Sequence, residues 1–118
     1  MLTSIVLKEP LLILTLDSVM DDYEEIEMIM EMIGPSRAEL HVHRQSVLRA
    51  LRILSNGHLI RPYKPSPPTN DLAPTEITGD DLCDGSYYYL VTAAGRALLV
   101  SEDGRIAWHK ANLIGTSE

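Results

Sequence analysis

The residues best suited to chemistry lie in a basic stretch in the middle of the chain, residues 37–64. This stretch holds six basic residues against one acid, Glu39, which gives it a local net charge of +5. The six are Arg37, Arg44, Arg49, Arg52, Arg61 and Lys64. Guanidinium and ammonium groups gathered in this way attract polyanions such as nucleic acids. The stretch therefore predicts an electrostatic binding site.

The rest of the chain is acidic. Residues 1–36 carry a net charge of −7 and residues 65–118 a net charge of −5, so the whole chain stands at −7. Salt screens exposed charges over roughly 10 Å at physiological ionic strength. A basic patch on one face can therefore attract a polyanion although acids elsewhere outnumber its charges.

Length and composition predict one soluble domain. The chain has 118 residues, of which 45% are hydrophobic and 23% charged, and we expect a single domain over 1–118. A single cysteine, Cys83, cannot form an internal disulfide, which favours a reducing cytosol. The apolar run Leu11 to Leu14 is too short to cross a bilayer. A cytoplasmic protein without a membrane partner follows as an expectation.

Two helices are expected before the basic stretch. Pro10 can open a helix at its first position, so we predict a helix from about Pro10 to Met20, with a buried strand as the rival. Asp21 and Asp22 then predict the N-cap of a second helix, which Gly34-Pro35-Ser36 ends. Its expected core face is Ile26, Ile29, Met30 and Ile33, its solvent face Glu24, Glu27 and Glu31, and Met28 and Met32 fall between.

The basic stretch itself predicts a third helix, around residues 41–55, followed by a strand. The core face of this helix is expected at Val47, Ala50, Leu51 and Leu54, with Gln45, Arg49 and Arg52 on the opposite face. Gly57 is free to take a positive φ at its end. Leu59 to Tyr63 then starts a strand, in which Pro62 implies an edge position or the end of the strand.

The C-terminal half predicts a loop, a strand and a short helix. Residues 65–85 have four prolines, five acids and no basic residue, and we predict a long, polar, partly disordered loop. Residues 86–91 are a strand that buries one or two of the tyrosines 87–89. Thr92 is expected to cap a helix over 93–101. Asp103-Gly104 predicts a turn, and 106–113 a last strand or an irregular segment.

Two segments, in this order, resemble bacterial transcriptional regulators. Residues 46–54, SVLRALRIL, followed by Leu59-Ile60, resemble the recognition helix and first wing strand of winged-helix regulators. Residues 89–99, YLVTAAGRALL, are similar to the Y-x-L-T-x-x-G-R-x-L segment after the wing in PadR-like and MarR-like families. The resemblance implies a mostly helical α+β fold: a winged helix-turn-helix with a two- or three-stranded wing sheet, and residues 65–85 as the wing loop.

The resemblance also implies double-stranded DNA as the partner and transcription regulation as the function. The central helix would enter the major groove, where Arg44, Gln45, Ser46 and Arg49 are placed to meet base edges. Arg52, Arg61 and Lys64 would meet phosphates. A homodimer is expected from the two-half-site logic of such regulators, and from an apolar N-terminus that exceeds what the core covers.

The alternative is a winged-helix module that binds protein instead of DNA. The acidic loop or the N-terminal helices would then supply the contact surface. The arrangement of the arginines separates the two readings: arginines facing outward on one continuous face favour DNA. Arginines neutralised by Glu24, Glu27 or Glu31 favour the protein-binding module.

No metal site, cofactor or enzymatic activity is predicted. His41 and His43 lack further ligands at metal-site spacing, and Cys83 and His109 lack the third partner of a nucleophilic site.

Overall fold

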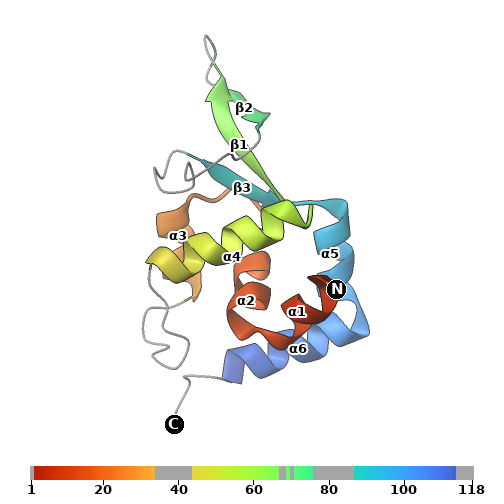
Figure 1. Ribbon diagram of the computed structural model, residues 1–118. Helices are drawn as coiled ribbons and strands as arrows, with labels where there is room; N and C mark the ends of the chain where they lie inside the picture. The colour runs from red at the N-terminus through yellow and green to blue at the C-terminus, as the bar shows by residue number, and fades with distance from the viewer. Residues whose placement is uncertain (1, 34–43, 67–68, 70, 76–86, 114–118) are drawn as a thin grey trace.

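The fold is of the α+β class and mostly helical, as the sequence predicts. The computed structural model describes residues 2–33, 44–66, 69, 71–75 and 87–113. Within them lie six helices and one three-stranded antiparallel sheet. The helices are α1 (Leu2–Lys8), α2 (Pro10–Ser18), α3 (Ile26–Ile33), α4 (Arg44–Asn56), α5 (Ala93–Val100) and α6 (Glu102–Leu113). The strands are β1 (Ile60–Ser66), β2 (Asp71–Pro74) and β3 (Tyr88–Val91). Figure 1 shows the helices gathered into one body, from which the β1–β2 hairpin projects.

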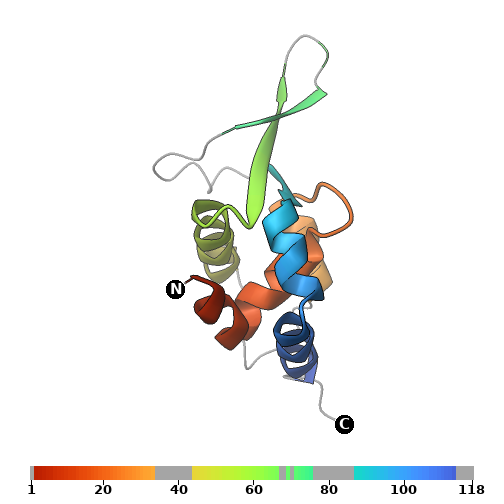
Figure 2. The same cartoon turned by 90° about the vertical axis from the view of Figure 1, so that its right-hand side faces the viewer.

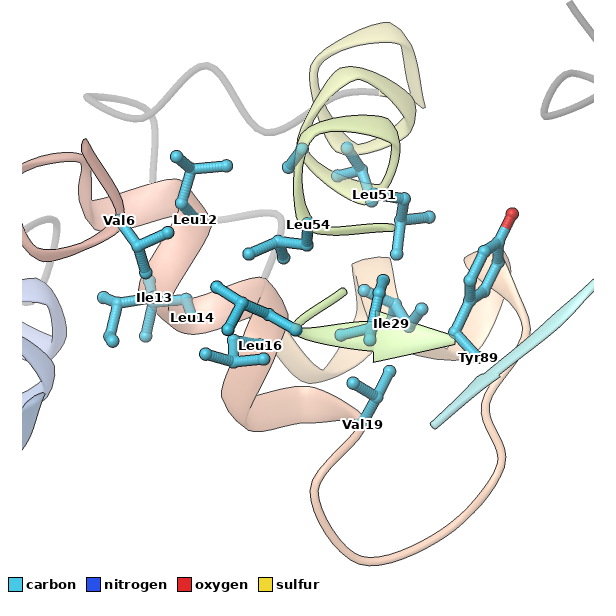
Figure 3. Close-up of a cluster of buried hydrophobic side chains, with 14 of the residues drawn as sticks. Val6, Leu12, Ile13, Leu14, Leu16, Val19, Ile29, Leu51, Leu54 and Tyr89 are labelled. Carbon is cyan, nitrogen blue, oxygen red and sulfur yellow. The ribbon is translucent and has the colours of Figure 1, made fainter. Parts of the chain in front are cut away.

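Helix α2 is the centre of the helical body. It begins at Pro10, so the predicted helix is confirmed and the rival strand is wrong. Every residue from Leu12 to Leu16 is buried, and the Thr15 hydroxyl donates a 2.7 Å hydrogen bond to the Leu11 carbonyl. The other five described helices all contact α2. Figure 3 shows Leu12 and Leu16 of α2 on the side of Leu54 of α4. Residues 12–16 are therefore covered within this chain, whereas Ile5 of α1 is 43% exposed.

The predicted start of the second helix is wrong. Helix α3 begins at Ile26, and Asp21 and Asp22 lie before it, outside any helix. Instead, the Glu24 amide donates to the Tyr89 carbonyl over 3.0 Å, and the Glu24 carbonyl accepts in return from the Tyr89 amide over 2.8 Å. The backbone groups on the outer edge of β3 would otherwise lack hydrogen-bond partners. Glu24 supplies them in an extended conformation, so the helix starts later than predicted. Burial raises the pKa of the Glu24 carboxyl, and the neighbouring Asp22 and Glu25 raise it further.

The rest of α3 follows the prediction. Ile26, Ile29 and Ile33 are buried, and Met30 is partly buried against them. Met28 and Met32 are exposed rather than intermediate. The predicted stop at 34–36 lies outside the described residues, as do the histidines at 41 and 43.

Helix α4 buries the predicted face but ends differently from the prediction. Val47, Ala50, Leu51 and Leu54 are all buried, as expected. Positive φ was expected at Gly57, yet His58 adopts it, with φ of 62°. The His58 amide donates to the Ser55 carbonyl and the Leu59 amide to the Leu54 carbonyl, both over 3.0 Å. This is a Schellman ending whose left-handed position holds a histidine instead of a glycine.

Replacing His58 by glycine should therefore stabilise the protein. A residue with a Cβ pays a conformational penalty at positive φ, so we expect His58→Gly to raise the free energy of unfolding by about 0.5–1 kcal/mol. Urea denaturation followed by circular dichroism measures it. The matched control is His109→Gly within α6, which should lower stability by roughly 0.5 kcal/mol through helix propensity. A loss of stability in His58→Gly would contradict the Schellman ending.

Strand β1 is central in the sheet, so the expected edge position of Pro62 needs correction. The strand order is β2-β1-β3, and both pairings are antiparallel. Pro62 nevertheless costs no bond to β3. Its carbonyl accepts from the Thr75 amide over 3.0 Å, and the nitrogen of a strand residue points to the same side as its carbonyl. The nitrogen of Pro62 therefore faces away from β3, toward Thr75, which lies just beyond the end of β2.

Part of the predicted loop over 65–85 is a strand. Residues Asp71–Pro74 form β2, which pairs with β1 from Tyr63 to Ser66. Residues 76–86 lie outside the described part. The predicted strand after the loop is confirmed as β3, and Tyr87 and Tyr89 are buried as expected.

The C-terminal prediction is right for α5 and wrong for α6. Thr92 caps α5, because its Oγ1 accepts from the Gly95 amide over 3.2 Å. Residues 102–113, predicted as a turn and a strand or irregular segment, form α6. Ser101 caps this helix through a 3.0 Å bond from the Gly104 amide, and acids occupy its first turn. What looked like an Asp-Gly turn is therefore a helix start.

Gly104 should tolerate no side chain. A Cβ there would lie 1.9 Å from the Leu98 carbonyl oxygen of α5. Gly104→Ala should therefore cost about 1–3 kcal/mol of stability, although helix propensity alone favours alanine by about 1 kcal/mol. Thermal unfolding measures the difference. A raised midpoint would mean that α5 and α6 do not pack as described.

Candidate nucleic-acid interface

The outer face of α4 carries a stripe of exposed polar side chains. Gln45, Arg49, Arg52 and Asn56 are all exposed and recur at i, i+4, i+7 and i+11. The buried face of the same helix holds this stripe outward, because Val47, Leu51 and Leu54 pack into the core. Figure 1 shows α4 lying across the body just below the hairpin. We call these four residues the α4 stripe.

The stripe belongs to a stretch that carries positive charge alone. Residues 44–66, which form α4 and β1, hold five basic residues and no acid. The structure therefore places five of the predicted basic residues on two consecutive elements. Arg37 lies outside the described residues.

The two basic residues of β1 face different ways. Arg61 is exposed, and Lys64 is partly buried with its Nζ 4.8 Å from the centre of the Tyr87 ring. Successive strand residues alternate between faces, so Arg61 and Lys64 lie on opposite faces of β1. Arg61 is the one that also borders the end of α4, through a shared pocket. Lys64 is held by a cation–π contact.

Acids of the N-terminal helices reach two of the predicted base-reading arginines. The Arg44 guanidinium pairs with the Glu27 carboxylate of α3. The Arg49 guanidinium lies 3.8 Å from the carboxylate of Glu9, which precedes α2. All four side chains are substantially exposed, so each pair contributes only about 0.2–1 kcal/mol. These pairs reduce the local charge without holding either arginine firmly.

The arginines were expected either to face outward together, as for DNA binding, or to be neutralised by acids of α3, as for protein binding. The structure shows one feature of each kind. Arg49, Arg52 and Gln45 do face outward on one side of α4, as the DNA reading requires. Arg44 is paired with Glu27, as the protein-binding reading requires. Ser46 is partly buried, and both it and Arg52 interact with other groups of the chain.

One residue near the interface was not predicted. Asn56 continues the stripe by one helical repeat, and the periodicity of Gln45, Arg49 and Arg52 was a signal that could have found it. His58, which belongs to the basic stretch of the sequence, borders the same region through its left-handed backbone. Together they extend the candidate interface to the junction of α4 and β1.

The residues considered for a metal or nucleophilic site are described only in part. No three His, Cys, Asp or Glu side chains gather there as a metal site would need. His109 is exposed and stacks edge-on against Trp108, with 5.2 Å between ring centres. Cys83 lies outside the described residues. Among the helices described, none has the length and apolar content to cross a membrane.

Comparisons of this chain with protein-family models, with curated proteins and with solved structures find no match. The fold and the α4 stripe are therefore the features from which a function can be inferred.

Proposed function

We propose that this chain is a winged-helix DNA-binding protein, a cytoplasmic transcriptional regulator that reads the major groove with α4. The order of elements supports the proposal: α3, α4, a β1–β2 hairpin and the returning strand β3. The segments that resemble PadR-like and MarR-like regulators fall on α4 and β1, and on β3 and α5. A homodimer that binds two half-sites completes the proposal, since such regulators read paired sites.

The observation that carries the proposal is the placement of the acid-free stretch 44–66. In a chain with a net charge of −7, five basic residues and the α4 stripe share two adjacent elements. Gln45, Ser46 and Arg49 occupy the half of α4 that would meet base edges. Gln suits adenine and Arg suits guanine, each through two hydrogen bonds. Arg52 and Arg61 would meet phosphates, and so would Lys64 if it left the Tyr87 ring.

The ion pairs with acids are weak enough to exchange for DNA. An exposed pair is worth about 0.2–1 kcal/mol, whereas a good bidentate contact to a base discriminates by about 1–3 kcal/mol. Arg44 and Arg49 can therefore leave Glu27 and Glu9 when a duplex binds. The acids lower the affinity without blocking the interface.

The hairpin contributes less than the helix in this account. Asp71 begins β2 and is exposed, so the far end of the hairpin carries negative charge. Phosphates repel such a group, which places the main contact on α4 and on the base of β1.

A protein-binding module is the second candidate, and α3 favours it. Met28 and Met32 are 42% and 50% exposed on the face of α3 that does not enter the core. Exposed methionines suit adaptable protein contacts. The Arg44–Glu27 pair also fits this candidate, because it neutralises one of the arginines.

Removing two arginines of the stripe should separate the candidates. Arg49→Ala with Arg52→Ala should weaken binding to short duplex DNA by roughly tenfold or more at low salt. The slope of the logarithm of the binding constant against the logarithm of the salt concentration should also become less steep, by about 1 for each lost phosphate contact. Fluorescence anisotropy measures both quantities on genomic fragments.

The matched control removes the same charge from α6. Arg105→Ala with Lys110→Ala changes two exposed basic residues on the far side of α2 from α4. This variant should bind nearly as well as the original chain. An equal loss of duplex affinity in both double variants, or no duplex binding by the original chain, would contradict the DNA proposal and favour the protein-binding module.

Freeing Arg44 should strengthen DNA binding. Glu27→Gln removes the carboxylate that pairs with Arg44 and should raise duplex affinity more than Glu31→Gln does. Both substitutions remove one exposed negative charge from α3, so the excess isolates the ion pair. We expect the affinity gain of Glu27→Gln to exceed that of Glu31→Gln by roughly two- to fivefold, which corresponds to the free energy of an exposed ion pair. Fluorescence anisotropy measures both affinities. Identical effects of the two substitutions would show that Arg44 does not contact the duplex.

A further inference from the structure

A pocket opens where α4 meets the sheet. It has a volume of about 400 Å³ and lies between the last turn of α4, the turn at His58 and the β1–β2 strands. Ser55 and Asn56 line it from the helix, Arg61 from β1, and Thr75 from the end of β2. Ile60, Pro62 and Pro74 supply the apolar part of the wall. Figure 2 shows this junction edge-on, between α4 and the long strand β1.

The polar lining of the pocket consists of groups that can donate hydrogen bonds to an anion. Arg61 brings a permanent positive charge, and Asn56, His58 and Ser55 bring an amide, an imidazole and a hydroxyl. No acid lines the pocket among the described residues. These donors come from a helix end, a turn and a strand, so one pocket brings together groups from three parts of the chain.

The Ser55 hydroxyl is closed off from the open pocket. Its oxygen is buried and makes no hydrogen bond within the described part of the chain, which carries a free-energy penalty. Asn56, His58 and Arg61 are exposed and are therefore the donors that a ligand can reach.

The backbone around the pocket is held in place from two sides. His58 is kept at φ of 62° by the Schellman ending of α4. Its carbonyl accepts a 2.6 Å hydrogen bond from the Thr92 hydroxyl. The last carbonyls of α4 are engaged by the His58 and Leu59 amides, so the negative end of the helix is partly satisfied before any anion arrives.

From this arrangement we propose that the pocket binds a phosphate group. A phosphate offers several acceptor oxygens, which suits a pocket that three elements line with hydrogen-bond donors. The pocket also has room for ordered waters around the group, since one water occupies about 30 Å³. Asn56 is the last member of the α4 stripe, so the pocket continues the candidate DNA interface. The nucleic-acid backbone is one source of the phosphate, and a free phosphate monoester is the other.

The test uses inorganic phosphate as the probe and the whole chain labelled with ¹⁵N, at constant ionic strength. We expect saturable shifts of the amide signals of Ser55, Asn56, His58 and Arg61. Arg61→Gln should weaken this binding by roughly tenfold, because a charge-assisted hydrogen bond is lost. Arg105→Gln on α6 is the matched control and should bind phosphate like the original chain. Shifts that do not saturate, that spread over the surface or that ignore Arg61→Gln overturn the proposal.

A second arm adds short duplex DNA to the phosphate-loaded protein and identifies the source. Displacement of phosphate from the same amides supports the pocket and assigns its phosphate to the nucleic-acid backbone. Phosphate binding that persists while duplex fails to bind supports the pocket with a free phosphate monoester, and the proposed function fails. Duplex binding along α4 without any phosphate binding overturns the pocket alone, and the proposed function stands.

Discussion

The burial of helix α2 is the constraint on which the rest of the fold depends. Its residues 12–16 have no face toward solvent, so the described helices must surround it. Full burial of a leucine or isoleucine side chain is worth about 1.5–3 kcal/mol, and α2 places four such residues in this run. Helix α6 covers one side with the small residues Ala107 and Ala111, and α4 covers another. Because the apolar face of α4 packs against α2, its polar face is exposed and can contact a partner.

The position of the hairpin relative to α4 depends on strand β3. On one side β3 pairs with β1, and on the other its Tyr89 and Val91 amides donate to the carbonyls of Glu24 and Val19. Thr92 then joins β3 to the end of α4: its amide donates to the Leu59 carbonyl over 3.0 Å and its hydroxyl to that of His58. The same threonine caps α5. One residue thus ties together β3, the turn after α4 and the start of α5.

The parts of the fold that follow a simple period could be predicted from the sequence. The buried face of α4 and the cap at Thr92 are confirmed because a helical repeat and a cap are local signals. The errors arise where a tertiary contact overrides a local one. Asp21 and Asp22 look like a cap, but the edge of β3 takes the backbone at Glu24. Asp103-Gly104 looks like a turn, but Ser101 caps a helix there and Leu98 leaves no room for a side chain.

The candidate site shows the same division. Periodicity correctly placed Gln45, Arg49 and Arg52 outward, since only the buried face of α4 had to be recognised. The pairing of Arg44 with Glu27 depends on how α3 packs against α4, and the pocket at Ser55 depends on the turn at His58. Neither is visible in the spacing of residues. The charged face of α4 is therefore predictable from the sequence. The pairing of Arg44 with Glu27 and the pocket are not.

Photocrosslinking tests the central claim, that the outer face of α4 contacts duplex DNA, most directly. A benzophenone side chain would be placed at position 45 on α4, or at position 109 on α6 as the comparison, since both positions are exposed. The account predicts a covalent protein–DNA product from position 45 at low salt, its loss as salt rises, and none from position 109. No product from position 45, or equal products from both positions, would contradict it.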